Sequence, residues 1–260
     1  MKYFIDTEFI EGPQDKTFLG FKCEETKPTI DLISIGIVGE PEMIAPARYI
    51  PNTTNLNYIL PKIHQREYYA ISKDFNLKKA WKNEWVRENV LKYIFEELES
   101  KDYKENSIAL QFGIGKSAIG TKFNINNLRR YINRYGKTNK QIAKEIIEFT
   151  TSPGVVEHAG IYPNTYPKES IKFYAYYADY DWVVFCQLFG TMMNLPKGFP
   201  MYAIDLKQDL DRKVIENGGE FTERLHNIQM SSNYPKQTNE HNALADAKWN
   251  YELYKFLQSV

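Results

Sequence analysis

The amino-acid sequence predicts an α/β protein with a mixed β-sheet that is flanked by helices. Three segments rich in β-branched and aromatic residues come first along the chain, and strand-like segments then alternate with helical ones. The composition agrees with this class, since 43% of the 260 residues are hydrophobic and 25% are charged, as in ordinary globular proteins. A chain of this length suits one large α/β domain or two small ones.

Charge and cysteine content narrow the class of protein further. The formal net charge is zero, so a nucleic-acid partner requires a local basic surface. Cys23 and Cys186 have neither a disulfide-framework nor a zinc-site spacing, which predicts a reduced, cytoplasmic protein. Asp6 and Glu8 interrupt any apolar signal segment, and no apolar run approaches the ~18–20 residues that cross a bilayer. We therefore expect no membrane association.

The N-terminal third predicts a meander of three strands. Residues 2–10, 32–38 and 66–72 have the composition of strands, the second being a buried β-branched run. Between them, residues 11–28 are polar with glycine and proline, and residues 41–65 contain four prolines and several asparagines. We expect both connections to be irregular.

The middle of the chain predicts helices. Residues 85–99 have apolar side chains at helical spacing, and residues 124–135 and 137–150 look like two further amphipathic helices. Residues 101–122 are predicted to be a polar, glycine-rich connection, and residues 151–169 a loop with three prolines.

The C-terminal third predicts strands that alternate with helices. Strands are expected at 171–178 and 201–206, and helices at 181–195, 207–217 and from about 242 to 258, with a polar linker at 227–239.

The segment FGIGKSAIG, residues 112–120, resembles a phosphate-binding loop. The motif G-x-x-x-x-G-K-S requires glycine where this chain has Leu110, and no buried strand leads into the segment. We interpret it as an ordinary basic loop that can still touch a substrate.

The first strand carries two carboxylates that need an explanation. Side chains alternate along a strand, so Asp6 and Glu8 point to the same face among apolar neighbours. Two like charges there repel each other and lose hydration, so a positive partner or a metal ion must compensate. The alternative is a solvent-facing edge strand with a simple polar face.

Two later stretches carry further acids. In YYADYDWVVF, Asp181 lies where a strand gives way to a helix, and its plain role is to cap that helix or complement its dipole. Asp179 could do the same one strand step earlier. In EHNALADAKW, His241 precedes the last helix and Asp246 lies in its first turns. A satisfied surface histidine is the alternative for His241.

Taken together, these residues form a recognisable order: D-x-E on an early strand, Asp at a strand–helix junction, then H-x-x-x-x-D at the last helix. This arrangement resembles the DEDDh class of 3′-5′ exonucleases, in the RNase T and proofreading-exonuclease superfamily. The resemblance implies an RNase H-like mixed sheet flanked by helices, with inserted loops and helices in this chain.

Several blocks give a narrower resemblance. YFIDTEFIEG, DLISIGIV, EYYAIS, WVRENVL, YADYDWVVFCQLFG and HNALADA look like the small bacterial and phage exoribonucleases typified by a mycobacterial enzyme that prefers adenylated 3′ ends. Residues 1–260 are then expected to form one exonuclease domain. Segments at about 11–28, 41–65 and 101–165 depart from the compact family pattern, which leaves substrate preference and oligomeric state open.

The resemblance implies a site and a reaction. Its ligands for two Mg²⁺ ions are Asp6, Glu8, Asp181 and Asp246, with Mn²⁺ expected to substitute, since all-oxygen ligation favours these ions over zinc. His241 would take a proton from the attacking water, as a neutral imidazole suits that role. The expected substrate is single-stranded RNA or a 3′ overhang, the product is a nucleoside 5′-monophosphate, and a homodimer is a weak expectation.

Alternatives remain at this point. The same chemistry could act on DNA, as in proofreading or repair, because contact with the 2′-hydroxyl is not a readable motif. A third hypothesis is a nucleic-acid-binding domain that has lost catalysis. Phe9 and Trp182 are candidates for stacking on terminal bases, with core packing the alternative. Arg129, Arg130 and Arg134 are candidates for holding phosphates, with a solvated helix face the alternative.

Overall fold

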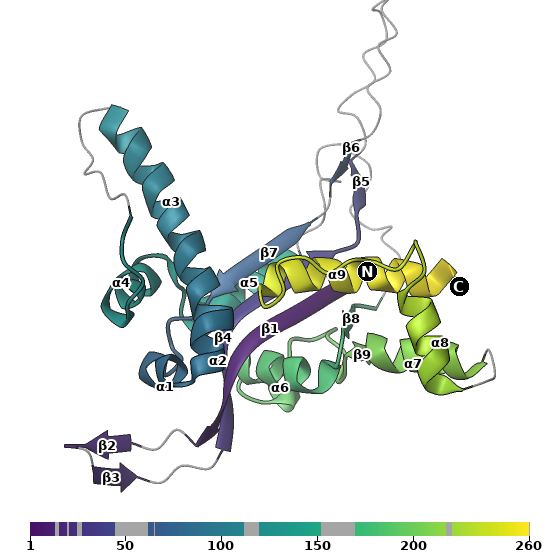
Figure 1. Cartoon of the computed structure of the whole chain (residues 1–260), viewed down its shortest axis with the longest axis horizontal. Coiled ribbons are helices and arrows are strands. Elements are labelled where there is room, and N and C mark those ends of the chain that lie inside the picture. The colour runs from purple at the N-terminus through teal and green to yellow at the C-terminus, as the bar shows by residue number, and fades with distance from the viewer. Residues whose placement is uncertain are drawn as a thin grey trace, which may run out of the picture.

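The centre of the molecule is a five-stranded mixed sheet (Figure 1) in the strand order β7–β4–β1–β8–β9. The computed structural model describes residues 1–13, 16–19, 21–24, 28–44, 62–64, 66–111, 120–151, 170–216 and 220–259. The strands are β1 (Lys2–Pro13), β4 (Pro28–Gly39), β7 (Glu67–Ile71), β8 (Lys172–Ala175) and β9 (Ile204–Asp205). β1, β4 and β7 pair antiparallel, whereas β8 and β9 run parallel to β1. This sheet confirms the predicted RNase H-like α/β class and the N-terminal meander.

The connections between the first strands are more regular than predicted. β1 and β4 continue beyond the sheet as a two-stranded ribbon, followed by the short pair β2 (Lys16–Phe18) and β3 (Phe21–Glu24) at its end (Figure 1). β5 (Glu42–Ile44) pairs with β6 (Lys62–His64), and residues 45–61 lie outside the described part. The expectation of irregular chain at 11–28 and 41–65 was therefore wrong in part. The ends of β1 and β4 that form the ribbon are polar or contain glycine and proline, so apolar periodicity does not reveal them.

The helical segment predicted at residues 85–99 begins earlier and ends later in the structure. A short helix, α1 (Leu77–Lys82), was missed, and α2 (Glu84–Val86) leads through a π-helical turn (Arg87–Leu91) into α3 (Lys92–Gln111). The predicted connection at 101–122 is thus helical as far as Gln111, while residues 112–119, which hold most of the loop motif, lie outside the described part.

Ion pairs explain why α3 extends beyond its apolar pattern. Near the middle of α3, just beyond the apolar pattern, Asp102 accepts hydrogen bonds from Arg134 and Tyr135 of the facing helix. That helix is α4 (Ile125–Tyr135), and α5 (Asn139–Thr151) follows it, so both amphipathic helices were predicted correctly. Residues 152–169, predicted as a loop, are outside the described part.

In the C-terminal third, α6 (Ala178–Leu188) starts and ends earlier than the predicted 181–195. Tyr177 has a left-handed backbone (φ 57°), which ends the β8 segment and starts the helix at once. A 3₁₀ turn (Met192–Asn194) follows. α7 (Leu206–Glu216) and α9 (Ala243–Ser259) were predicted, whereas α8 (Phe221–Gln229) was missed and overlaps the start of the expected linker.

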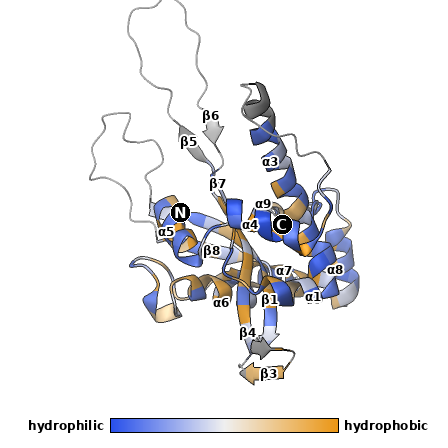
Figure 2. Cartoon of the chain, turned by 90° about the vertical axis from the view of Figure 1, so that its left-hand side faces the viewer, coloured by the Kyte–Doolittle hydropathy of each residue, from blue (hydrophilic) through white to orange (hydrophobic). Residues whose placement is uncertain are grey.

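Helices cover both faces of the sheet. α5 and α6 pack on the face that presents Tyr3 and Ile5 of β1, while α7 and α9 pack on the face that presents Phe4. Figure 2 shows hydrophobic residues gathered along α6 and the strands, whereas α8 at the surface is mainly hydrophilic. None of the helices in the described ranges combines the length and the apolar character that a membrane span requires.

The apolar clusters define the place of the acids. Along one face of β1, Phe4 belongs to the cluster under α9, and Ile10 belongs to a second cluster under α3 and α4. Asp6 and Glu8 lie between them on the same face. The sheet register shifts directly after Glu8, and such bulges frequently lie beside active sites because they redirect side chains.

Candidate metal centre

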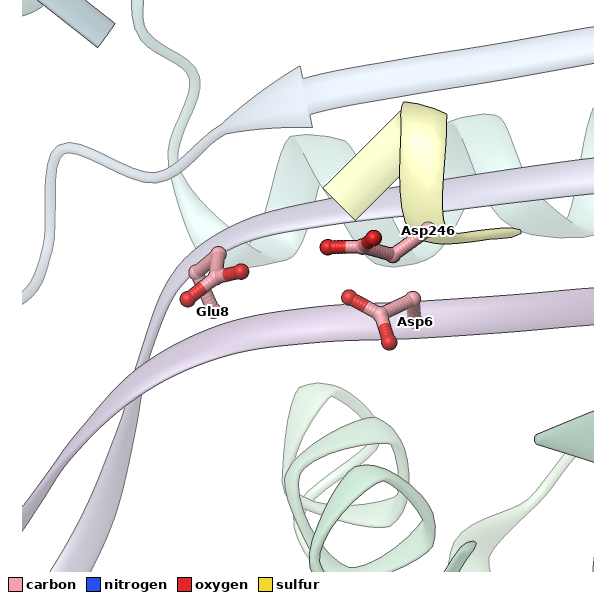
Figure 3. Close-up of side chains that lie close together, drawn as sticks. All are labelled: Asp6, Glu8 and Asp246. Atoms are coloured by element: carbon pink, nitrogen blue, oxygen red, sulfur yellow. The ribbon is translucent and has the colours of Figure 1, made fainter. Parts of the chain in front are cut away.

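Three carboxylates from two elements converge over β1. Each of Asp6, Glu8 and Asp246 offers an oxygen, and these oxygens all lie within 4.8 Å of one another. In Figure 3 the two side chains of β1 and the one from the first turn of α9 point toward a common space. The alternation of β1 puts Asp6 and Glu8 on one face, and the packing of α9 on that face adds Asp246.

Asp181 reaches the site from the edge of β1 that β8 leaves open. β8 pairs with β1 only as far as Phe4. Beyond that point the backbone N–H of Thr7 would lack a partner, and it donates instead to Oδ1 of Asp181 at 2.8 Å. The Thr7 hydroxyl donates to the same oxygen at 2.6 Å. These two bonds fix Asp181 next to the other acids.

The structure distinguishes Asp181 from its neighbour Asp179. Both lie in the first turn of α6, but Asp181 is buried and Asp179 is exposed. Burial is the main cause that raises the pKa of Asp6, and the nearby charge of Asp181 is the next largest cause. Asp181 therefore belongs to the acidic cluster, although its oxygens are not among those three within 4.8 Å.

Both oxygens of Asp246 are already held by the loop before α9. The backbone N–H of His241 donates to Oδ2 at 2.8 Å, and the side-chain amide of Gln237 donates to Oδ1 at 2.7 Å. Sequence reasoning did not single out Gln237, because a glutamine in a polar segment carries no readable signal.

His241 lies on this loop in an uncommon backbone conformation. Its φ of 67° is left-handed, which a non-glycine residue adopts at some cost. Its ring meets Trp85 of α2 edge-on, with ring centroids 4.8 Å apart. The next residue, Asn242, caps α9 through its side-chain oxygen, which accepts from the N–H of Ala245. Trp85, which is exposed, was not predicted to lie at the site.

Electrostatics make this cluster unfavourable without a counter-ion. Burial raises the pKa of Glu8 to about 8, with the charges of Asp246 and Asp181 adding to it. Burial also raises the pKa of Asp181 to about 7, against hydrogen bonds from Thr7 that lower it. Burial is also the main cause that raises the pKa values of Asp6 and Asp246. Every charged neighbour that shifts Asp6 and Glu8 is another carboxylate.

This donor set fits hard divalent cations. Carboxylate oxygens are the ligands that Mg²⁺ and Mn²⁺ prefer, and no cysteine is part of the cluster. A bound cation would also offset the repulsion that raises the pKa values. The four acids can therefore hold a divalent metal. Among the described residues, the positive charge that acts on the cluster is that of His241, which lowers the pKa of Asp246.

The two predicted stacking residues lie in different surroundings. Phe9 is partly buried and stacks parallel on Tyr180 of α6, with ring centroids 5.5 Å apart and an interplanar angle of 5°. Trp182 is buried in the core, packs against Phe173 and Phe185, and donates its indole N–H to the carbonyl of Met201. Core packing, the alternative for Trp182, accounts for its position.

The predicted phosphate-binding arginines lie on α4. The guanidinium of Arg134 pairs with Asp102 at 2.7 Å and with Glu105 at 3.2 Å. Arg130 lies over the ring of Tyr131, and Arg129 donates to Asn126. Arg134 thus joins α3 to α4, which is a structural use of its charge.

Comparison with known proteins gives consistent relatives. A family model, the 3′-5′ exoribonuclease Rv2179c-like domain, matches residues 115–258, which include Asp181, His241 and Asp246. Two curated proteins of Mycobacterium tuberculosis are similar: 3′-5′ exoribonuclease Rv2179c of strain H37Rv and 3′-5′ exoribonuclease MT2234.1 of strain CDC 1551. Each is 26% identical over 208 residues, covering 80% of this chain and 73% of the relative.

Proposed function

This chain belongs to the family of 3′-5′ exoribonucleases with an Rv2179c-like domain, and from that premise we propose that it shortens single-stranded RNA or 3′ overhangs one nucleotide at a time. Membership in the family makes the chain a hydrolase of the exoribonuclease class. The observation that carries the proposed mechanism is the convergence of Asp6, Glu8 and Asp246 within 4.8 Å, with Asp181 anchored beside them. We take residues 1–260 as a single exonuclease domain.

In this proposal Asp6, Glu8, Asp181 and Asp246 hold two Mg²⁺ ions, for which Mn²⁺ can substitute. When bound, such ions lower the pKa of water and stabilise the leaving 3′ oxygen. The chain supplies rigid positions for its ligands: β1 fixes Asp6 and Glu8, the Thr7 bonds fix Asp181, and the loop 237–241 fixes Asp246.

His241 acts as the general base. Its ring stands on the loop beside Asp246 and against Trp85, so it has a defined place at the edge of the acidic cluster. There it takes the proton of the water that attacks the phosphorus of the last phosphodiester. A new P–O bond to that water forms as the P–O3′ bond breaks, the departing 3′ oxygen takes up a proton from solvent, and a nucleoside 5′-monophosphate is released.

The Phe9–Tyr180 stack is the proposed platform for a terminal base. Phe9 follows Glu8 directly in β1 and so points to the opposite face, where it packs against the core cluster under α5 and α6 and backs the ring of Tyr180. Tyr180 precedes Asp181, a proposed metal ligand, directly in α6. Tyr180 is about half exposed, so part of its side chain is accessible to a base. Stacking of this kind is sequence-tolerant, as an exonuclease requires.

The experiment that tests the function lets RNA and DNA compete for the same enzyme. Equimolar 5′-labelled oligo(A) RNA and the matching DNA are incubated in one tube with Mg²⁺, beside a lane with EDTA, and both ladders are followed. We expect a one-nucleotide ladder from the 3′ end of the RNA that EDTA abolishes. A ladder on DNA alone would instead indicate a proofreading or repair enzyme. Absence of cleavage of either strand would support a binding domain.

A further inference from the structure

Gly36 of β4 lies directly beneath the first turn of α9. It pairs with Asp6 across the sheet, so it faces the same side as the acidic cluster. A β-carbon on Gly36 would lie 2.2 Å from the carbonyl oxygen of Ala243 and 2.5 Å from the Cα of Leu244. The helix backbone therefore rests on the strand backbone at this point, and any side chain at position 36 would push the helix away.

Asn250 makes a second contact one turn after Asp246. The two residues are four apart, so they share a face of α9. The side-chain amide of Asn250 donates to the carbonyl of Ile5 at 2.9 Å, and Asn250 is buried. Ile5 lies beyond the last β1 residue that pairs with β8, so this bond occupies a backbone position that the sheet leaves open.

Asp246 lies between these two contacts along the helix. Gly36 contacts the helix backbone at Ala243 and Leu244, just before Asp246, and Asn250 holds the helix one turn after it. The strand positions involved are opposite Asp6 and next to it. We propose that Gly36 and Asn250 are positioning residues, which set the distance from Asp246 to Asp6 and Glu8 and thereby the geometry of metal binding. This inference rests on the proposed function, because it concerns the same acidic cluster.

The obstacle at Gly36 differs from ordinary core packing. At Gly39, in the same strand and also buried, a β-carbon would meet side-chain atoms of Arg66 and Tyr3 at 3.4 Å, which is an ordinary van der Waals distance. At Gly36 the obstacle is the backbone of α9, which cannot rotate away. Alanine is therefore expected to displace the helix at position 36 and to be tolerated at position 39.

The test compares Gly36→Ala with Gly39→Ala in the full chain. Binding of Mn²⁺ to the protein alone is titrated by electron paramagnetic resonance, cleavage of oligo(A) RNA is measured against Mg²⁺ concentration, and circular dichroism reports folding. For Gly36→Ala we expect Mn²⁺ affinity and kcat each to fall about 10–100-fold, as for residues that support metal ligands, with part of the kcat recovered at high Mg²⁺. Gly39→Ala should keep both values.

Asn250→Leu provides the second arm, in case Gly36→Ala does not fold. It keeps a similar volume without the hydrogen-bond donor, and we expect weaker Mn²⁺ binding in a folded protein. The positioning role would be overturned if either variant folds and keeps the Mn²⁺ affinity and kcat of the wild type. Equal losses in Gly36→Ala and Gly39→Ala would overturn it as well. Neither result would contradict the proposed function. A wild-type chain that neither binds Mn²⁺ nor cleaves RNA would overturn the proposed function, and this inference with it.

Discussion

The backbone N–H of His241 donates a hydrogen bond to Oδ2 of Asp246 at 2.8 Å. This bond joins the proposed general base to a proposed metal ligand through one short loop. Because Gln237 of the same segment holds the other oxygen of Asp246, the loop and the carboxylate are expected to keep a fixed relation. A change in this loop should therefore affect metal binding and proton transfer together.

Replacing Asp181 by asparagine should abolish cleavage and leave the protein folded. Asparagine keeps the shape of the side chain and can still accept from Thr7, but it removes the charge that a cation requires. RNA cleavage and circular dichroism measure the two effects. Asp179→Asn is the matched control, since Asp179 lies in the same helical turn and is exposed. Equal activity in the two variants would move the metal site away from Asp181.

Replacing His241 by alanine should lower kcat by roughly 10²–10⁴, the usual contribution of a general base. Mn²⁺ binding should remain, because the bond from residue 241 to Asp246 comes from the backbone. Single-turnover kinetics at saturating metal separate the two properties. His226→Ala, at an exposed position of α8, should behave as the wild type. Unchanged kcat for His241→Ala would exclude it as the base.

The stability of the metal-free protein should decrease as the pH rises. Burial raises the pKa of Glu8 to about 8, above the value of about 4.3 in an unfolded chain. The folded state therefore holds this proton more tightly, and its advantage is lost between about pH 4 and pH 8. Asp181, whose pKa is raised to about 7, has the same sign.

Thermal unfolding in EDTA at pH 5 and pH 8 measures this dependence. We expect Tm to be lower at pH 8, and Mg²⁺ to raise Tm more at pH 8 than at pH 5. Glu8→Gln should flatten the difference, because it removes one of the titrating groups. A wild-type protein whose Tm in EDTA differs between the two pH values no more than that of Glu8→Gln contradicts the prediction.

Replacing Tyr180 by alanine should weaken RNA binding with little effect on folding. The loss of one stacking face corresponds to about 1–3 kcal/mol per base, which should appear mainly as a higher KM. Fluorescence anisotropy of labelled oligo(A), recorded with Ca²⁺ as the divalent ion, measures RNA binding. Steady-state kinetics measure KM in parallel. Tyr103→Ala is the control, since Tyr103 on α3 is similarly exposed. Equal binding by both variants would remove the Phe9–Tyr180 stack from the substrate path.

The features of this protein that depend on local pattern can be predicted from the amino-acid sequence. The alternation of β1 gave one face to Asp6 and Glu8, the amphipathic spacing gave α4 and α5, and the order of motifs indicated the family before any geometry. These features depend on neighbours a few residues apart, so they can be read along the chain.

The contacts between distant segments of the chain were not predictable and depend on the three-dimensional packing. The extension of α3 depends on ion pairs with α4, and the ends of β1 and β4 that form the ribbon carry no apolar alternation to mark them. The place of Asp181 follows from an open edge of β1, and that of Asp246 from a glycine in another strand on which α9 rests. Such contacts join residues tens to hundreds of positions apart. Their geometry is set by the packing of whole elements, which local periodicity does not encode.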